Sequence, residues 1–170
     1  MIRLTEAQAT KLSGVTMTPL QRLMAAPKLG WSWKITTEQW LSIGLADRLR
    51  ELTLSGHLRA VWTHIPNEGK RHPIVGAIQK RMGCIAGSPD FVFLWDSDSR
   101  PSCGFIELKT PEQYGTSQKT GKRVKTRSQG QQSPCQGYFQ SWCQDQRVAY
   151  ALCRTVDEAL EVLKSWGMLA

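Results

Sequence analysis

Two carboxylates and one lysine lie near one another in the middle of the sequence, at Asp90, Glu107 and Lys109. Carboxylate oxygens from two segments suit Mg²⁺, which prefers oxygen ligands and keeps several of its waters. Bound Mg²⁺ polarises a phosphate and lowers the pKa of a coordinated water, which can then attack phosphorus. A neighbouring ammonium stabilises the negative charge that develops on the phosphate oxygens. The three residue types together indicate metal-dependent hydrolysis of a phosphodiester.

The segments around these residues predict two neighbouring strands. Residues 91–95 are wholly apolar, which is typical of a buried strand, and residues 104–110 follow after a polar turn at 96–102. Because side chains alternate between the two faces of a strand, Glu107 and Lys109 share one face.

Pairing of the two strands as a hairpin would bring Asp90 close to Glu107, and the backbone carbonyl of Leu108 could supply a further metal ligand. Each motif alone has an ordinary structural interpretation, since Pro-Asp is usually a turn and Glu-x-Lys is usually an exposed strand face. Their spacing around an apolar run is what favours a metal site.

The order of four sequence blocks carries a resemblance to a known family. Pro89-Asp90 followed by residues 107–109 resembles the signature of the PD-(D/E)xK nuclease superfamily, which has low specificity on its own. The ordered set of blocks is much more specific and resembles VRR-NUC domains, in the small stand-alone form found in phages and prophages. The four blocks are residues 64–69, 87–90, 105–109 and 133–136, and the resemblance covers roughly residues 36–167.

This resemblance implies an α/β fold with a PD-(D/E)xK (restriction-endonuclease-like) core, in which a four-stranded mixed sheet is flanked by helices. It implies a Mg²⁺- or Mn²⁺-dependent DNA endonuclease, with Asp90 and Glu107 binding the metal and Lys109 stabilising charge. Related stand-alone proteins resemble Holliday junction resolvases, which cut branched DNA as homodimers, so structure-selective cleavage and a homodimer are further expectations. A phage- or prophage-encoded protein of this kind would act in the cytoplasm of the bacterial host cell.

Two more side chains each have two interpretations. Glu38 lies in the first turn of a predicted helix, where an acid interacts favourably with the helix dipole. The resemblance implies that Glu38 is instead a third metal-site carboxylate. Gln136 is spaced from Ser133 as the partner in a capping box, whereas the resemblance implies a catalytic glutamine that faces the active site. We expect that one side chain cannot fill both of these roles completely.

The remaining sequence predicts the elements that position these residues. A capping box at Thr36 and Gln39 begins a helix that Gly56 ends, and its apolar face consists of Leu41, Leu45, Leu49 and Leu52. The other predicted elements are a strand at 58–65, a short helix at 73–82, a helix from Ser133, a strand at 148–153 and a helix from Thr155 to Gly167. This order predicts a single domain over residues 36–170 with a mixed sheet, preceded by an N-terminal arm of residues 1–35.

The net charge of +8 suits a partner with a phosphate backbone. Much of the charge lies in residues 111–132, which lack a periodic apolar pattern and predict a long flexible loop inserted after the second strand. We interpret this insertion as a basic flap that orders on DNA; the alternative is a solvated, disordered insertion. The candidate DNA-binding residues are Lys119, Lys122, Arg123, Lys125 and Arg127 in the insertion, and Asn67, Lys70 and Arg71 in the loop after the strand at 58–65.

Composition argues against several other classes of protein. No apolar run is long enough to span a bilayer, and residues 1–11 contain no secretory apolar region. Five cysteines without a Cys-x-x-Cys pair favour free thiols in a reducing cytosol over disulfides or a zinc site. His64, Glu68 and His72 are spaced like ligands on a helix, but the intervening proline and glycine argue against one. Two alternatives to a nuclease remain: a DNA-binding or assembly module with a vestigial site, and a structural protein with a solubilising loop.

Overall fold

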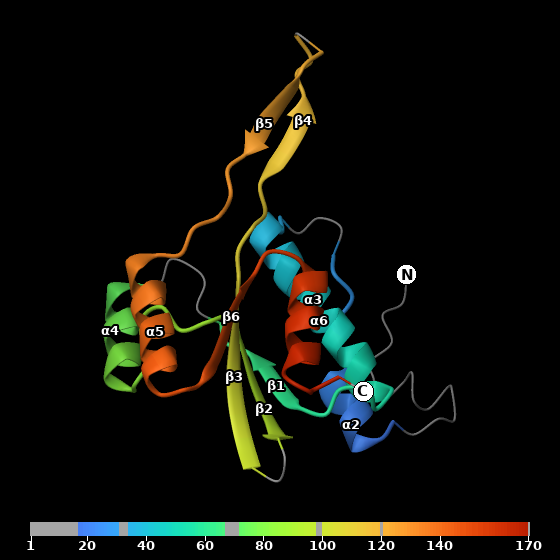
Figure 1. Ribbon diagram of the computed structural model, residues 1–170, viewed down its shortest axis with the longest axis vertical. Helices are drawn as coiled ribbons and strands as arrows, with labels where there is room; N and C mark the ends of the chain where they lie inside the picture. Colours follow the sequence, from blue (N-terminus) through green and yellow to red (C-terminus); the bar gives the residue numbers. More distant parts are fainter. Residues whose placement is uncertain (1–16, 31–33, 67–71, 98–99, 120, 170) are drawn as a thin grey trace.

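The computed structural model describes residues 17–30, 34–66, 72–97, 100–119 and 121–169. Its centre is a four-stranded mixed sheet in the order β1-β2-β3-β6 (Figure 1). Strands β1 (Val61–His64), β2 (Phe91–Ser97) and β3 (Arg100–Leu108) are antiparallel neighbours, and β6 (Ala149–Cys153) lies parallel to β3. The predicted α/β class and mixed four-stranded sheet flanked by helices are confirmed.

The main core lies on one face of this sheet, under helices α3 (Thr37–Leu54) and α6 (Val156–Ser165). Alternation along β2 and β3 places apolar side chains on this face. The fully buried members are Leu45, Leu49, Phe91, Phe93, Ile106, Leu108, Ala159, Leu163 and Met168. Helix α5 (Pro134–Asp145) packs on the opposite face, where the Phe105 and Phe139 rings meet edge to face at 5.4 Å. Glu107 belongs to this second face, because it alternates with Ile106 and Leu108.

The predicted helix starts are confirmed at three places. Thr36 and Ser133 each accept a hydrogen bond from the backbone of the third helical residue and complete a capping box, and Thr155 caps α6. Two shorter helices, α2 (Pro19–Met24) and α4 (Pro73–Arg81), complete the helices of the described chain. No helix in these described residues is long and apolar enough to cross a membrane.

Two strand boundaries differ from prediction. The first strand begins at Val61 rather than at residue 58, because Leu58 pairs with Leu169 and the Arg59 N–H donates to the carbonyl of Met168. The polar turn predicted at 96–102 is too long, since β2 and β3 stay paired as far as Ser97 and Arg100. Polar residues can continue a ladder at an exposed hairpin end, where backbone groups supply the pairing.

The predicted flexible loop at 111–132 is wrong in its main part, which forms a two-stranded hairpin. Strands β4 (Gln113–Thr116) and β5 (Arg123–Arg127) pair antiparallel and project from the body of the domain (Figure 1). All five residues of β5 are exposed, so the hairpin has no buried face and therefore no apolar alternation in its sequence. We call residues 113–127 the basic hairpin.

Candidate active site

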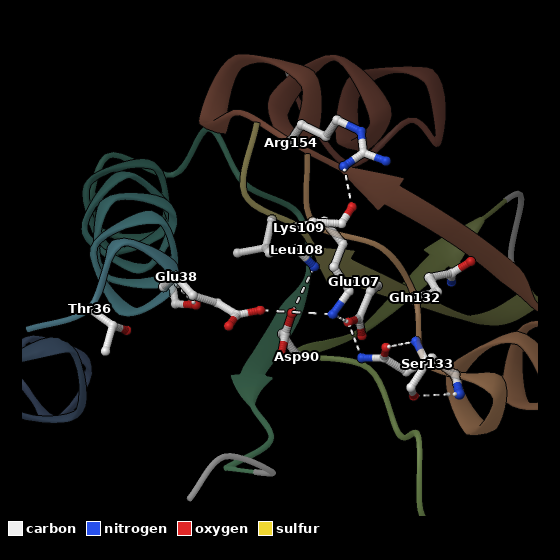
Figure 2. Close-up of polar contacts among 12 residues, drawn as sticks. Thr36, Glu38, Asp90, Glu107, Leu108, Lys109, Gln132, Ser133 and Arg154 are labelled. Atoms are coloured by element: carbon white, nitrogen blue, oxygen red, sulfur yellow. Dashed lines mark hydrogen bonds and ion pairs between the residues drawn. The ribbon is translucent and has the colours of Figure 1, made fainter. Parts of the chain in front are cut away.

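Strand pairing brings the two central carboxylates together. Phe91 pairs with Ile106, so Asp90 lies at the end of β2 beside Glu107 of β3. The Asp90 Oδ2 atom accepts a hydrogen bond of 2.7 Å from the backbone N–H of Leu108 (Figure 2). Both carboxylates are buried, and the predicted approach of Asp90 to Glu107 is confirmed.

Lys109 lies between carboxylates from two different layers. It follows directly after β3, and its backbone N–H donates to the carbonyl of Cys153 on β6. The ammonium Nζ lies 2.8 Å from Glu107 Oε1 and 3.8 Å from Glu38 Oε1. Figure 2 shows Glu38 extending from α3 toward this lysine. Glu38 therefore keeps its first-turn position and also reaches the site, which is compatible with either of its two interpretations.

Gln136 makes both the capping contact and a contact to the carboxylates. Its Oε1 accepts from the Ser133 backbone N–H at 2.8 Å, which completes the capping box. Its Nε2 donates to Glu107 Oε1. One side chain can make both contacts because the acceptor and the donor of an amide are different atoms.

Burial and a neighbouring negative charge both disfavour the ionised form of Glu107. Its side chain is fully buried, and desolvation followed by the Asp90 charge raises its pKa from 4.5 to about 7, despite Lys109. Burial likewise raises the pKa of Asp90. The second oxygen, Oε2 of Glu107, is buried and has no hydrogen-bond partner among the described residues. A buried carboxylate oxygen without a partner destabilises the fold. A cation at this position would supply the missing interaction.

The side chains of this site can supply some, but not all, of the ligands of a divalent cation. No group of three or more histidine, cysteine, aspartate or glutamate side chains in the described residues is arranged to hold a metal ion. Mg²⁺ needs only one or two carboxylates, because waters and substrate phosphates supply its other ligands. Asp90 and the unpaired oxygen of Glu107 meet that requirement. Glu38 and the carbonyl of Leu108 remain further candidates.

Gly87 allows the loop before Asp90 to lie against the start of α5. Its φ is +84°, and a Cβ added there would overlap the backbone carbonyl of Cys135 and lie 2.6 Å from the Gln136 nitrogen. This close backbone contact holds the Gly-Ser-Pro-Asp segment next to the helix that carries Gln136. Gly87 and Cys135 are 48 residues apart in sequence, and the two blocks meet at this glycine.

The candidate DNA-binding residues divide into two groups. Asn67, Lys70 and Arg71, together with Glu68, lie outside the described residues. The basic residues of the insertion lie on or beside the basic hairpin, away from the carboxylates rather than among them (Figure 1). The structure therefore separates these five cations from the candidate metal site.

Three further residues lie near the site; sequence analysis missed Tyr150 and Arg154, whereas His64 belongs to the first of the four sequence blocks. His64 packs edge-on against Phe91 at 5.1 Å, and burial lowers its pKa while the Asp90 charge opposes that shift. Tyr150 lies on β6 opposite Phe105; its hydroxyl accepts from Gln132 at 3.1 Å, and burial followed by the Glu107 charge raises its pKa. Arg154 donates to the carbonyl of Gly130 at 2.9 Å. Only the parallel pairing of β3 with β6 gives Tyr150 and Arg154 their positions.

No protein-family model, curated protein or solved structure matches this chain in the comparisons. The VRR-NUC resemblance therefore rests on the four sequence blocks, and the chemistry of the site rests on the contacts described above.

The two contacts of Gln136 can be separated by substitution. We expect Gln136→Glu to keep the acceptor for Ser133 but to lose the donor to Glu107 and to place a second carboxylate beside it. If the nuclease activity that the sequence predicts is present, DNA cleavage should then fall at least 10-fold (on the order of 1–3 kcal/mol for an unpaired buried group). Ser133→Ala should cost about 1 kcal/mol of stability and leave the activity within about twofold (roughly 0.4 kcal/mol). Thermal unfolding and initial cleavage rates of both variants test this separation, which would be lost if Ser133→Ala were the less active protein.

Proposed function

We propose that this protein is a Mg²⁺- or Mn²⁺-dependent DNA endonuclease of the VRR-NUC type, with a PD-(D/E)xK core. The observation that carries the proposal is the convergence of Asp90, Glu107 and Lys109 at one buried point, where one oxygen of Glu107 has no hydrogen-bond partner in the described part of the chain. The sheet and its flanking helices agree with such a core.

Each residue of the site has a distinct part in this proposal. Asp90 and Glu107 would hold the metal, and Glu38 adds negative charge from α3. A metal bound there would activate water and neutralise phosphate charge. Gln136 donates to one oxygen of Glu107 and leaves the other available as a ligand for a metal. Lys109, nearly buried, provides a fixed positive charge for the phosphate oxygens in a site of low dielectric, where it acts strongly.

The direct test is cleavage of a panel of labelled DNAs in Mg²⁺, Mn²⁺ or EDTA. The panel holds linear duplex, single strand, flap, splayed arm and four-way junction. Metal-dependent cutting supports a nuclease, and a preference for the four-way junction supports the resolvase-like refinement. Binding of these DNAs without any cutting would instead support a binding or assembly module with a vestigial site.

Metal binding should also be measurable, in the absence of DNA, as an increase in the thermal stability of the protein. Because the pKa of Glu107 is raised in the folded protein, the fold binds an extra proton between about pH 4.5 and pH 7. The contribution of Glu107 to the free energy of unfolding therefore falls as the pH rises through that window. The rise of its pKa from 4.5 to about 7 corresponds to a loss of about 3 kcal/mol. We expect Mg²⁺ or Mn²⁺ to raise the Tm at pH 8 much more than at pH 5.

The matched variants for this measurement are Glu107→Gln and Glu161→Gln. Glu107→Gln removes the titrating group, so its Tm should respond weakly to both pH and metal. Glu161 lies exposed on α6, and its replacement should leave both responses intact. Differential scanning calorimetry in buffers with metal or EDTA measures both effects. A full metal response in Glu107→Gln would rule out Glu107 as a ligand.

A homodimer is the second part of the proposal, and an apolar surface supports it. Helix α4 buries none of the side chains described on it, although its apolar residues recur at helical spacing. Figure 1 draws α4 and α5 on the same side of the sheet. The exposed side chains there are Ile74, Val75, Ile78, Met82, Ile85, Tyr138 and Trp142, each between 46% and 77% exposed. They present on the order of 800 Å² together (about 150–250 Å² for a large side chain), which is the share each partner buries in a standard interface.

Charge introduced into this surface should therefore produce monomers. We expect Ile78→Glu combined with Met82→Glu to shift the mass from twice 19.1 kDa to 19.1 kDa in light scattering. Leu54→Glu, on an exposed position of α3, is the control and should remain dimeric. A monomeric wild-type protein at all concentrations would exclude this interface.

A further inference from the structure

The basic hairpin has features that its sequence alone does not indicate. It is a paired β-ribbon that extends beyond the body of the domain (Figure 1). A two-stranded ribbon of this kind is only marginally stable by itself. Its described contacts are local, for example the Arg123 guanidinium 4.4 Å above the Tyr114 ring and the hydrogen bond of 2.8 Å from Tyr114 to Glu112. The ribbon therefore presents its side chains outward instead of contributing to the core.

Charge is concentrated on this ribbon. Residues 111–132 contain five basic side chains and one acidic one, a net +4 that is half of the +8 of the whole chain. Arg123 and Lys125 alternate along β5 and so project from one face, whereas Arg127 lies beyond a register shift in the ladder, where it pairs with Gln113. Lys125 pairs with Glu112, whereas the guanidinium of Arg123 rests on an aromatic ring. The five exposed residues of β5 thus include three cations, two of which share a face.

Both ends of the ribbon are anchored at the candidate active site. The preceding chain leaves from Lys109, and the following chain enters α5 at Ser133, next to Gln136. At the base, the Gly130 N–H donates to the Thr110 carbonyl at 2.9 Å. Arg154 donates to the Gly130 carbonyl and ties this base to the end of β6. A ligand held along the ribbon is therefore held at a fixed place relative to Glu107 and Lys109.

The dimensions of the ribbon match duplex DNA. Nine residue steps separate Thr110 from Lys119, so the hairpin can reach at most about 30 Å from its base at roughly 3.3 Å per residue. The paired strand β4 makes up three of these steps. One turn of B-DNA is about 34 Å long. The major groove, about 12 Å wide, admits a two-stranded β-ribbon. The length and the charge together indicate contact with phosphates within one helical turn.

We propose that the basic hairpin grips double-stranded DNA within one helical turn, to one side of the phosphate at the candidate active site. The position of the cut relative to the grip rests on the proposed nuclease function; binding by the hairpin does not. Single-stranded DNA is a poorer match, since its binding sites stack bases on several aromatic rings and the described part of the insertion offers Tyr114, already covered by Arg123. The major groove of an RNA duplex is too deep and narrow for a ribbon.

The test measures binding in EDTA, where no cleavage interferes. The variant replaces Arg123, Lys125 and Arg127 with glutamine. The control replaces Lys80, Arg81 and Lys164 with glutamine; these three are exposed elsewhere on the domain, so the net charge falls equally. Probes are a labelled 30-base-pair duplex and a single strand of the same length, titrated from 50 to 200 mM salt. Thermal unfolding confirms that both variants are folded.

We expect the hairpin variant to bind the duplex at least 10-fold more weakly than wild type. The slope of log K against log salt should become shallower by about 2–3, since each lost phosphate contact removes about 0.9. The single strand should be affected less, and the control should lose little. An equal loss in the control, an unchanged slope, or an equal loss on both probes would overturn the proposal.

A length series then places the grip relative to the cut. Shortening the duplex to less than about 10 base pairs, one helical turn, on one side of the cut should reduce wild-type cleavage to the level of the hairpin variant. Shortening on the other side should have little effect. Equal sensitivity on both sides would contradict a one-sided grip. If DNA binding depends on the hairpin but no DNA is cleaved, the proposed nuclease function is refuted and the proposed binding of DNA by the hairpin is retained.

Discussion

Replacement of Glu107 by glutamine is expected to reduce the proposed metal-dependent DNA cleavage by about 10³-fold or more, since it would remove a proposed ligand of the metal ion that neutralises charge in the transition state. Asp90→Asn and Lys109→Met should cause losses of the same order, because Lys109 pairs with Glu107 and both interact electrostatically with Asp90, so the three side chains act as one unit. Initial rates on the preferred DNA of the panel give these ratios.

These variants should remain folded, which separates a catalytic role from a structural one. Glutamine is close in shape to glutamate and can still accept the hydrogen bond from Gln136. At pH 8 without metal, Glu107→Gln should be more stable than wild type, because it removes a carboxylate whose pKa is raised by burial. Glu161→Gln is again the control, with wild-type rates. Substantial cleavage by all three site variants would defeat the proposed nuclease function.

Gly87→Ala is expected to destabilise the fold by about 2–5 kcal/mol. Its positive φ of +84° alone costs about 1–2 kcal/mol for a residue with a side chain. The added methyl group would also meet the backbone of Cys135 and Gln136, which cannot move aside as a flexible side chain would, and overpacking costs a further 1–3 kcal/mol or so. Urea unfolding measures the total.

Gly83 provides a matched control in the same connection. Its φ is also positive, at +98°, but a Cβ added there would have no atom within 4 Å. Gly83→Ala should therefore cost only the backbone term, about 1–2 kcal/mol. The difference between the two variants isolates the contact between the 87–90 block and α5. Equal destabilisation by both would mean that this contact contributes nothing beyond glycine's conformational freedom.

Local signals in the sequence predicted much of the fold correctly. The capping boxes at Thr36 and Ser133 and the buried positions Leu45 and Leu49 are determined by spacing within one helix. The approach of Asp90 to Glu107 required only one hairpin, which an apolar run and a following Glu-x-Lys strand indicate. Short-range patterns therefore suffice for the central part of the candidate site.

Other features depend on contacts that no local pattern records. The basic hairpin has no buried face, so its strands lack the alternation by which strands are predicted. The first strand begins later than predicted because residues near the C-terminal end of the domain take the hydrogen bonds of Arg59. The double role of Gln136 required the position of Glu107 in space, since spacing shows only the capping interaction.

The parallel pairing of β3 with β6 has a consequence for the length of the basic hairpin. These neighbouring strands are joined by residues 109–148, a connection that contains the hairpin. The entropy lost when a connection closes grows only with the logarithm of its length. Deleting a 15-residue hairpin from a 40-residue connection would recover only about 0.4 kcal/mol by that relation, against a folding free energy of about 5–15 kcal/mol for a typical domain. The core therefore constrains the hairpin's length very weakly, and insertions or deletions there can change reach along a ligand with almost no change in the stability of the sheet.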